Sequence, residues 1–407
     1  MPGPLSHIRV LDLSRVLAAP WTGQNLADLG AEVIKIERPE SGDDSRAFGP
    51  PWLKDANGND TGESAYFACA NRGKKSLTLN LSKSEGQRIV RELAAQCDVL
   101  LENYKFGDLA RYGLAWDDLR NINPRLIYCS VTGFGQTGPY RERPGYDFMI
   151  QGMGGLMSVT GERDELPGGG PQKAGIPIAD IMTGMYATIA VCAALAHRAE
   201  TGIGQHLDLA LLDVQVAVLA NQGANYLATG VSPRRLGNAH PNIVPYQTFK
   251  TSDGDMILAC GNDNLFRKFC EVADCSGLAD DPRFSTNGKR VENRAELTAL
   301  LNAIVARRTT RDWVDALEVA GVPNGPINTL EQVFQEPQAI ARGLKFEMAH
   351  PVAGKVQLIR SPMRFSETPL EHTVPPPVLG EHTTEILRGM LSLGDAEIEK
   401  LRADGVV

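Results

Sequence analysis

The sequence has no excess of basic charge: 41 Lys and Arg stand against 49 Asp and Glu, for a net charge of −8. An acidic protein repels nucleic acid and anionic membranes, so we expect neither as a general partner. Long hydrophobic runs are also lacking. The longest lies around 185–196, is too short to span a bilayer and ends at His197 and Arg198. The N-terminus enters a strand-like run at once, which leaves no room for a signal or transit peptide. These absences predict a cytoplasmic protein with no membrane attachment.

Metal-binding and redox patterns are absent as well. The seven cysteines are scattered and contain no C-x-x-C pair, and most lie in apolar runs, which is typical of reduced, buried thiols. The seven histidines are isolated, and none stands at metal-ligand spacing from a cysteine or carboxylate. The G-x-S-x-G elbow of a Ser/His/Asp hydrolase is missing too. We therefore expect no metal and no tightly bound cofactor.

One glycine motif invites a dinucleotide-binding interpretation. GFGQTG (133–138) follows a predicted strand and matches G-x-G-x-x-G. That fingerprint requires the glycines to open a helix whose N-terminus carries the pyrophosphate. Here Pro139 follows at once and no helical pattern begins. The first predicted βα turn, SRVLAAP (14–20), contains no glycine. Nicotinamide binding is therefore not favoured.

Strands and helices alternate along the first half of the chain. Residues 7–14 and 31–37 have the pattern of strands on either side of a helix at 20–30. The alternation continues in strands at 75–82, 98–104, 125–133 and 205–213, with helices at 84–97, 116–121 and 214–228. A strand, a helix and a second strand imply a right-handed βαβ unit. The predicted fold class is α/β, a Rossmann-like parallel sheet with helices on both faces.

The pattern changes near residue 230. Residues 230–250 contain three prolines and no helical period, as in a linker. A hairpin follows at 248–261, with Asp253-Gly254 as its turn, and then three helical runs at 264–273, 294–308 and 310–320. The tail returns to a strand at 355–360 and a final helical pair. We therefore predict a large domain over 1–229, a smaller inserted α+β domain over 230–330, and a return to the large domain over 331–407.

A single carboxylate stands out in AGIPIADIMTG (174–184). Asp180 has apolar neighbours on both sides and precedes a segment apolar enough for a buried helix. A carboxylate in such a setting loses hydration, which is costly unless it is hydrogen-bonded or used in chemistry. The structural alternative is a helix N-cap, which would satisfy the first free N–H groups. Residue type and position alone leave both interpretations open.

Basic residues gather near the ends of the predicted strands. Arg38 ends the second strand, and the others follow or precede later ones: Arg72, Lys74, Lys75, Lys105, Arg111, Arg141 and Arg143. In an open α/β sheet, the carboxyl ends of the strands and the loops beyond them form the ligand crevice. Cations gathered there in an acidic protein indicate a phosphate-bearing ligand. The alternative is ordinary solvated surface charge.

Together, these segments resemble the family III CoA-transferases, the group that contains formyl-CoA transferase, carnitine CoA-transferase and the α-methylacyl-CoA racemases. The segments that carry the resemblance cover nearly the whole chain: 10–43, 71–81, 98–113, 130–147, 174–184 and 204–213. VLDLSRVLAAPWTGQNLADLGAEVIKIERPESGD (10–43) and AGIPIADIMTG are the most specific. The resemblance implies an enzyme that moves CoA from an acyl-CoA donor to a free carboxylic acid.

The resemblance also implies roles for individual residues. Asp180 aligns with the catalytic aspartate, which reacts through an aspartyl anhydride and an aspartyl-CoA thioester. Coenzyme A contacts are implied at Val16, Ala18, Arg38, Leu79, Asn80, Asn103, Tyr104, Arg111, Arg143 and Tyr146. The family further implies an interlocked homodimer, in which each chain threads a ring made by the other. Proline-rich linkers near 225–250 and 320–355 would close that ring.

Two departures from the family pattern bear on the alternatives. Where the racemase branch has a histidine, this chain has Tyr146, whose higher pKa makes it a poor exchange base near pH 7. That favours transfer over the alternative of an α-methylacyl-CoA racemase. No glycine run follows GNA (237–239), which favours longer acyl groups than formyl, such as succinyl or another dicarboxylic acyl. A non-catalytic acyl-CoA-binding protein is the remaining alternative, and the retained Asp180 argues against it.

Overall fold

The computed structural model describes residues 3–407, which form two compact units. Unit 1 takes residues 3–155 together with Ala174–Leu219 and Pro337–Val407, and unit 2 takes Leu156–Lys173 and Ala220–Glu336. The division reflects contacts within one folded chain. Independent folding of the predicted domains, 1–229, 230–330 and 331–407, stays a prediction.

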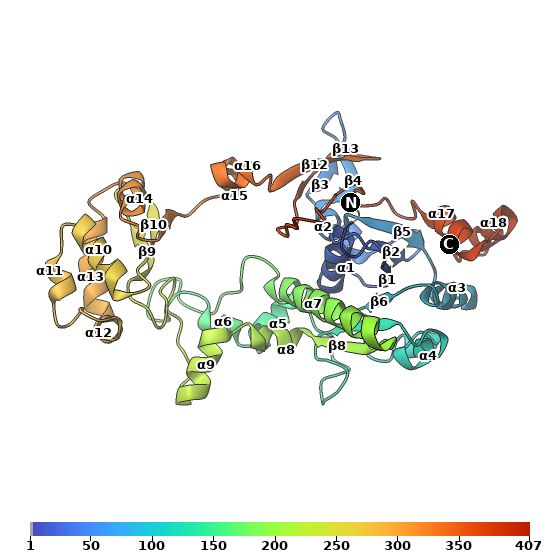
Figure 1. The fold of residues 1–407 in the computed structure, drawn as a ribbon, viewed down its shortest axis with the longest axis horizontal. Coiled ribbons are helices and arrows are strands. Elements are labelled where there is room, and N and C mark those ends of the chain that lie inside the picture. The colour runs from blue at the N-terminus through green and yellow to red at the C-terminus, as the bar shows by residue number, and fades with distance from the viewer. Residues whose placement is uncertain (1–2) are drawn as a thin grey trace. The chain divides into compact units, whose positions relative to one another are not determined.

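Unit 1 is built on a six-stranded sheet in the order β5-β2-β1-β6-β7-β8, and every pairing in it is parallel (Figure 1). Its strands are β1 (Arg9–Asp12), β2 (Glu32–Glu37), β5 (Lys74–Thr78), β6 (Val99–Glu102), β7 (Ile127–Thr132) and β8 (His206–Ala210). The chain extends the sheet from β1 in one direction and from β6 in the other. The strand order therefore reverses between β1 and β6, where a parallel sheet opens a crevice at the carboxyl ends of its strands. The predicted α/β class is confirmed.

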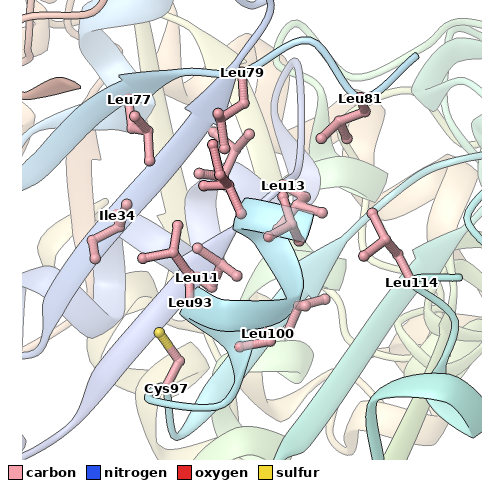
Figure 2. Packing of buried hydrophobic residues seen from close by; sticks show 14 of the residues in the cluster. Leu11, Leu13, Ile34, Leu77, Leu79, Leu81, Leu93, Cys97, Leu100 and Leu114 are labelled. Atoms are coloured by element: carbon pink, nitrogen blue, oxygen red, sulfur yellow. The ribbon is translucent and has the colours of Figure 1, made fainter. Parts of the chain in front are cut away.

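Helices cover both faces of this sheet. On one face, α1 (Ala18–Asp28) and α7 (Ile178–Thr201) pack together and join Val10 and Val33 in one apolar cluster. On the other, Leu11 and Leu13 pack with side chains of α3 (Ser84–Ala94), α4 (Trp116–Ile122), α17 (Thr383–Leu391) and α18 (Asp395–Ala403). Figure 2 shows this second cluster, with Leu11 near Leu93 and Leu100. Val10 and Leu11 point to opposite faces, as the two-residue period of a strand requires.

Helix α7 is longer than the apolar run at 185–196. By length and composition alone, its 24 residues could cross a membrane, so the expectation of too short a segment was wrong. Half of its apolar window is buried, and the helix packs against α1, α8 (Leu211–Ala217), β7 and β8. It is a core helix of unit 1.

Unit 2 is built on the antiparallel sheet β11-β10-β9 (Asn324–Pro326, Asp255–Ala259 and Tyr246–Lys250). Among the helices of unit 2 are α10 (Asp263–Val272), α11 (Gly277–Asp280), α12 (Asn287–Glu292), α13 (Arg294–Val305) and α14 (Thr310–Val319). Phe249, Phe269 and Trp313 are buried at the centre. The predicted hairpin and the three helical runs are confirmed. The short elements α11, α12 and β11 were not predicted, because three to six residues hold too little of a hydrophobic period.

Several predicted elements differ from the structure. The helix expected at 214–228 is two helices, α8 and α9 (Ala220–Thr229), because the backbone leaves the right-handed helical region between them, with a left-handed φ of 46° at Ala220. The strand expected at 355–360 is β13 (Gly354–Ile359), and its partner β12 (Lys345–His350) was not predicted. The hairpin of β3 (Trp52–Lys54) and β4 (Asp60–Ser64) and the helix α2 (Ala65–Asn71) were also missed.

Candidate active site

A cavity of about 170 Å³ opens at the switch point of the sheet, entirely within unit 1. It lies between the loops that follow β1, β6 and β7 and the first turn of α7. We call it the crevice. Seven of the predicted site residues line it: Val16, Ala18, Asn103, Tyr104, Arg143, Tyr146 and Asp180. Residues from four separate segments of the sequence therefore meet at one edge of the sheet.

Three more predicted contacts, Arg38, Leu79 and Asn80, line a neighbouring cavity of about 290 Å³. Because Arg15 and Tyr104 line both cavities, the two spaces adjoin. Arg111 lines neither of them. Its exposed side chain is ion-paired with Asp108 on the loop after β6. The structure thus brings the predicted residues together at one site, with Arg111 outside it.

The turn after β1 reaches the crevice without a glycine. Val16 takes a φ of 70°, the left-handed region that a β-branched residue rarely adopts. Its N–H donates to Asp43 Oδ1 and Oδ2, at 3.1 and 3.3 Å. The N–H of Arg15 donates to Asn103 Oδ1 at 2.9 Å, and Asn103 Nδ2 donates to the carbonyl oxygen of Arg15 at 2.7 Å. These bonds hold the strained turn against the loop after β6, and the two loops form the walls of the crevice.

A buried ion pair supports this turn. Lys35 Nζ lies 2.8 Å from Asp43 Oδ2, and both side chains are fully buried. Burial alone would raise the pKa of Asp43, but the charge of Lys35 holds that pKa well below its usual range. Lys35 also donates to the carbonyl oxygen of Ser14 at 2.7 Å. Asp43 is therefore ionised and fixed beneath the backbone of Val16.

Three of the cations assigned to the crevice from the sequence are placed elsewhere. Lys74 begins β5, is fully buried and pairs with Asp12 at 2.8 Å, and burial lowers its pKa to about 8. Arg72 is buried against Asp28, with Nε 2.9 Å from Oδ1. Lys75 pairs with two glutamates. These side chains stand at the amino end of their strand, so they hold the sheet and α1 rather than a ligand.

Of the arginines that do line the crevice, Arg143 is the least neutralised. Its guanidinium lies over the rings of Tyr140 and Phe134, 4.5 and 5.3 Å from their centroids. Within residues 3–407 it pairs with no carboxylate. By contrast, Arg15 of the crevice and Arg38 of the adjoining cavity share the carboxylate of Asp44. The charge of Arg143 is therefore available to an anionic ligand.

Asp180 is the third residue of α7, which begins at Ile178 after Pro177. It is not the N-cap, and that alternative interpretation was wrong. The first turn is capped instead by Asp147 of α5 (Asp147–Met153), whose Oδ1 accepts from the N–H groups of Ala179 and Asp180 at 2.8 and 3.3 Å. Because a residue of another helix caps α7, the carboxylate of Asp180 is left to line the crevice.

The carboxylate of Asp180 has no hydrogen-bond donor among the described residues. Burial, and after it the charge of nearby Asp147, raise its pKa to about 7. A carboxylate that ionises near neutral pH and has free lone pairs can act as a nucleophile or as a base.

The residues that position Asp180 were not found from the sequence. Gln151 donates to Asp147 Oδ2 at 2.7 Å and accepts from the N–H of Ala174 at 2.8 Å, so it ties α5 to the approach of α7. Asp147 stands in the PGYD motif beside Tyr146, but its partners lie 32 and 33 positions away. No local spacing could identify it.

Residues 3–407 contain no group of three or more His, Cys, Asp or Glu arranged to hold a metal ion. Their cysteines are free thiols, and Cys97, Cys129, Cys260 and Cys270 are buried, as expected. No helix begins at GFGQTG, since the next one, α5, starts at Asp147.

The chain belongs to CoA-transferase family III, whose model matches residues 5–383. The chain is 50% identical to the succinate–glutarate CoA-transferase of Agrobacterium fabrum, over 94% of this chain and 95% of the relative. It is 45% identical to the succinyl-CoA:glutarate CoA-transferase of Mus musculus, over 99% and 90%. The crystal structure of a CAIB/BAIF family protein from Brucella suis matches with 51% identity and a TM-score of 0.83, over 96% and 100% of the two chains. The predicted family and the predicted activity, CoA transfer, are confirmed.

Proposed function

We propose that this enzyme moves CoA between dicarboxylic acids, with succinate and glutarate as the best-supported pair. The names of the two relatives at 50% and 45% identity support this choice. The departure from formyl-CoA transferase after GNA (237–239) supports it independently. Coenzyme A and its thioesters would be substrates, with no tightly bound cofactor.

We propose Asp180 as the nucleophile. Its carboxylate oxygen attacks the thioester carbonyl of the acyl-CoA donor, the C–S bond breaks, and the products are an aspartyl anhydride and CoA thiolate. The thiolate then attacks the aspartyl carbonyl, which releases the donor acid and leaves an aspartyl-CoA thioester. The carboxylate of the acceptor attacks that thioester and forms a second anhydride, and the returning thiolate attacks its acyl carbonyl. New acyl-CoA leaves, and Asp180 is restored.

The observation that carries this proposal is the unbonded carboxylate of Asp180 in the crevice, with its raised pKa. A structural carboxylate at a helix start would be capping N–H groups, and here Asp147 does that instead. Partial burial also limits the access of water, which would hydrolyse an anhydride.

We propose that CoA lies along the crevice and the adjoining cavity. The backbone at Val16 and Ala18 and the side chains of Leu79 and Tyr104 would contact the nucleotide. Arg38 and Arg143 would pair with its phosphates through their planar guanidinium groups. Tyr146 lines the crevice and Asn80 lines the adjoining cavity. Arg111 is kept as a CoA contact only on the strength of the family pattern.

The experiment that tests the mechanism is hydroxylamine trapping during turnover. Incubation of the enzyme with succinyl-CoA and hydroxylamine should give a protein hydroxamate at Asp180, located by peptide mass spectrometry. Asp180→Ala should give none, and should lose transfer of CoA to glutarate while it still binds CoA. Full transfer by Asp180→Ala would overturn the mechanism.

We also propose that the chain forms an interlocked homodimer in the cytoplasm. The proline-rich segments near 225–250 and 320–355 support long, stiff connections. Exposed apolar side chains on α7, those of Met185, Tyr186 and Ile189, support a partner surface. Mixing two differently tagged preparations tests this proposal. Interlocked chains can exchange only by unfolding, so rapid formation of mixed dimers under native conditions would refute interlocking.

A further inference from the structure

Unit 2 contains a second polar cavity, of about 1120 Å³, with four arginines in its wall: Arg163, Arg234, Arg235 and Arg294. Arg163 lies on the loop after α6 (Leu156–Val159), and Arg234 and Arg235 follow α9. Arg294 is the first residue of α13. The cluster therefore comes from three segments of unit 2 and is separate from the residues that line the crevice.

Two of these arginines have donors that nothing satisfies. Arg163 Nε and Arg294 Nη1 are buried and have no hydrogen-bond partner within residues 3–407. Arg294 uses only Nη2, which donates to the carbonyl oxygen of Pro241 at 2.8 Å. Arg235 differs, because it is ion-paired with Asp164. A buried donor without a partner costs free energy, and the cost is larger for a charged group.

Arg294 is partly buried beside a second arginine, whose charge has the same sign. Burial lowers its pKa, and the charge of Arg163 lowers it further. His240 also faces this guanidinium, since burial and then the charge of Arg294 lower the pKa of His240. Arg294 stands in addition at the start of a twelve-residue helix, where the helix dipole disfavours a cation. Burial, the charge of Arg163 and the helix dipole each destabilise the cation of Arg294. A bound anion would offset these effects.

The acidic residues of the wall do not supply that anion. Asp164 is used by Arg235, and Glu292 pairs with Lys289 at 2.7 Å. Glu165 is exposed and makes no ion pair with a described residue. Counted together, four arginines and three acidic residues leave the wall with one net positive charge. That positive charge is left for a bound anion to neutralise.

We infer that Arg163 and Arg294 form a binding site for the carboxylate group of a small organic acid, distinct from the crevice of Asp180. The planar fork of each guanidinium matches the two oxygens of a carboxylate. The cavity is large enough for a ligand of four or five carbons. The inference does not depend on Asp180 being a nucleophile.

Calorimetric titration of the full-length protein with succinate, in chloride-free buffer, tests this site. Arg163→Gln and Arg294→Gln should each weaken succinate binding at least tenfold. The matched control is Arg311→Gln on α14, because Arg311 is exposed and pairs only with Asp315. All variants are also titrated in the Asp180→Ala background, which separates this site from the crevice. The loss caused by the arginine substitutions should be the same in both backgrounds.

A thermal shift gives a second readout with an opposite sign. In ligand-free protein, Arg163→Gln removes a repelling charge and should raise the Tm, whereas succinate should raise the Tm of the wild type by more than that of the variant. A general structural defect would lower the Tm of the variant both without and with succinate. Undiminished succinate binding by both arginine variants would overturn the site, and so would the lack of any succinate effect on the wild type. Phosphate binding as tight as succinate would overturn the assignment to a carboxylate.

Discussion

Asp147 accepts a hydrogen bond from the backbone N–H of Asp180 at 3.3 Å, and its charge also raises the pKa of the Asp180 side chain. One carboxylate therefore fixes the position of the second and opposes its ionisation. The two effects can be separated by a substitution that keeps the acceptor oxygen and removes the charge.

Asp147→Asn is that substitution. Oδ1 can still accept from the N–H groups of Ala179 and Asp180, while the loss of the charge should move the pH midpoint of kcat to below 7. Activity at pH 5.5, relative to pH 8, should rise, and circular dichroism should show an intact fold. Asp117→Asn, an exposed aspartate on α4, is the control and should leave the midpoint in place. An unchanged midpoint in Asp147→Asn would contradict the electrostatic coupling.

The raised pKa of Asp180 predicts how stability depends on pH. The pKa of an aspartate in the unfolded chain is near its ordinary value of 3.8 and that of the folded Asp180 is about 7, so the folded state binds more protons between these pH values. The free energy of unfolding should therefore fall as pH rises from about 4 to 7 through this group. Asp180→Asn should remove the dependence and should stabilise the protein at pH 8 more than at pH 4. Urea titrations at the two pH values measure the difference, and equal effects would argue against a raised pKa.

The arginines of the site should differ in their contribution to CoA binding. Arg143 has no carboxylate partner among the described residues, whereas Arg38 is already paired with Asp44. Arg143→Ala should therefore weaken CoA binding more than Arg38→Ala, by roughly tenfold at low salt, and both losses should shrink as salt screens the phosphates. Arg120→Ala, on the surface of α4, serves as the control. Titrations at 20 and 300 mM salt that show equal losses for both site variants would contradict this order.

Asn103 should matter to stability as well as to the ligand. Asn103→Ala removes both hydrogen bonds to the backbone of Arg15 and frees the strained turn at Val16. We expect a loss of about 1–2 kcal/mol in the free energy of unfolding, together with weaker CoA binding. Asn121→Ala, which removes one exposed bond on α4, should cost less than half of that. A variant that loses CoA affinity with no loss of stability would show that Asn103 contacts CoA without holding the turn.

What the sequence could predict was local. The strands of the parallel sheet were found because short strand-like runs such as residues 7–14 alternate with helical runs along the chain, and Asp180 was found because its neighbours are apolar. The misassigned cations show the limit. Lys74 is placed by Asp12, 62 positions away, and no pattern around Lys74 contains that partner.

The same limit applies to the two sites. The cap that Asp147 provides for α7 joins two helices, and the pair of Arg163 and Arg294 joins segments more than 100 positions apart. Each depends on which side chains the tertiary structure brings together, and on which of them it leaves without a partner. The turn at Val16 is a third case, because its left-handed backbone occurs at a residue type that a sequence pattern would not select.

The wall of the site beside Asn80 has a consequence for how the protein is made. The backbone N–H of Asn80 donates to the carbonyl oxygen of Val406, and its side-chain amide donates to that of Gly405, 325 positions later. Ile386 and Leu401 pack in the same apolar cluster as Leu79. At ribosomal speeds of roughly 5–20 residues per second, the first part of unit 1 waits on the order of 16–65 s for these partners. During that time the part of the apolar face that α17 and α18 cover is exposed on the nascent chain, so holding by a chaperone should raise the yield of folded enzyme.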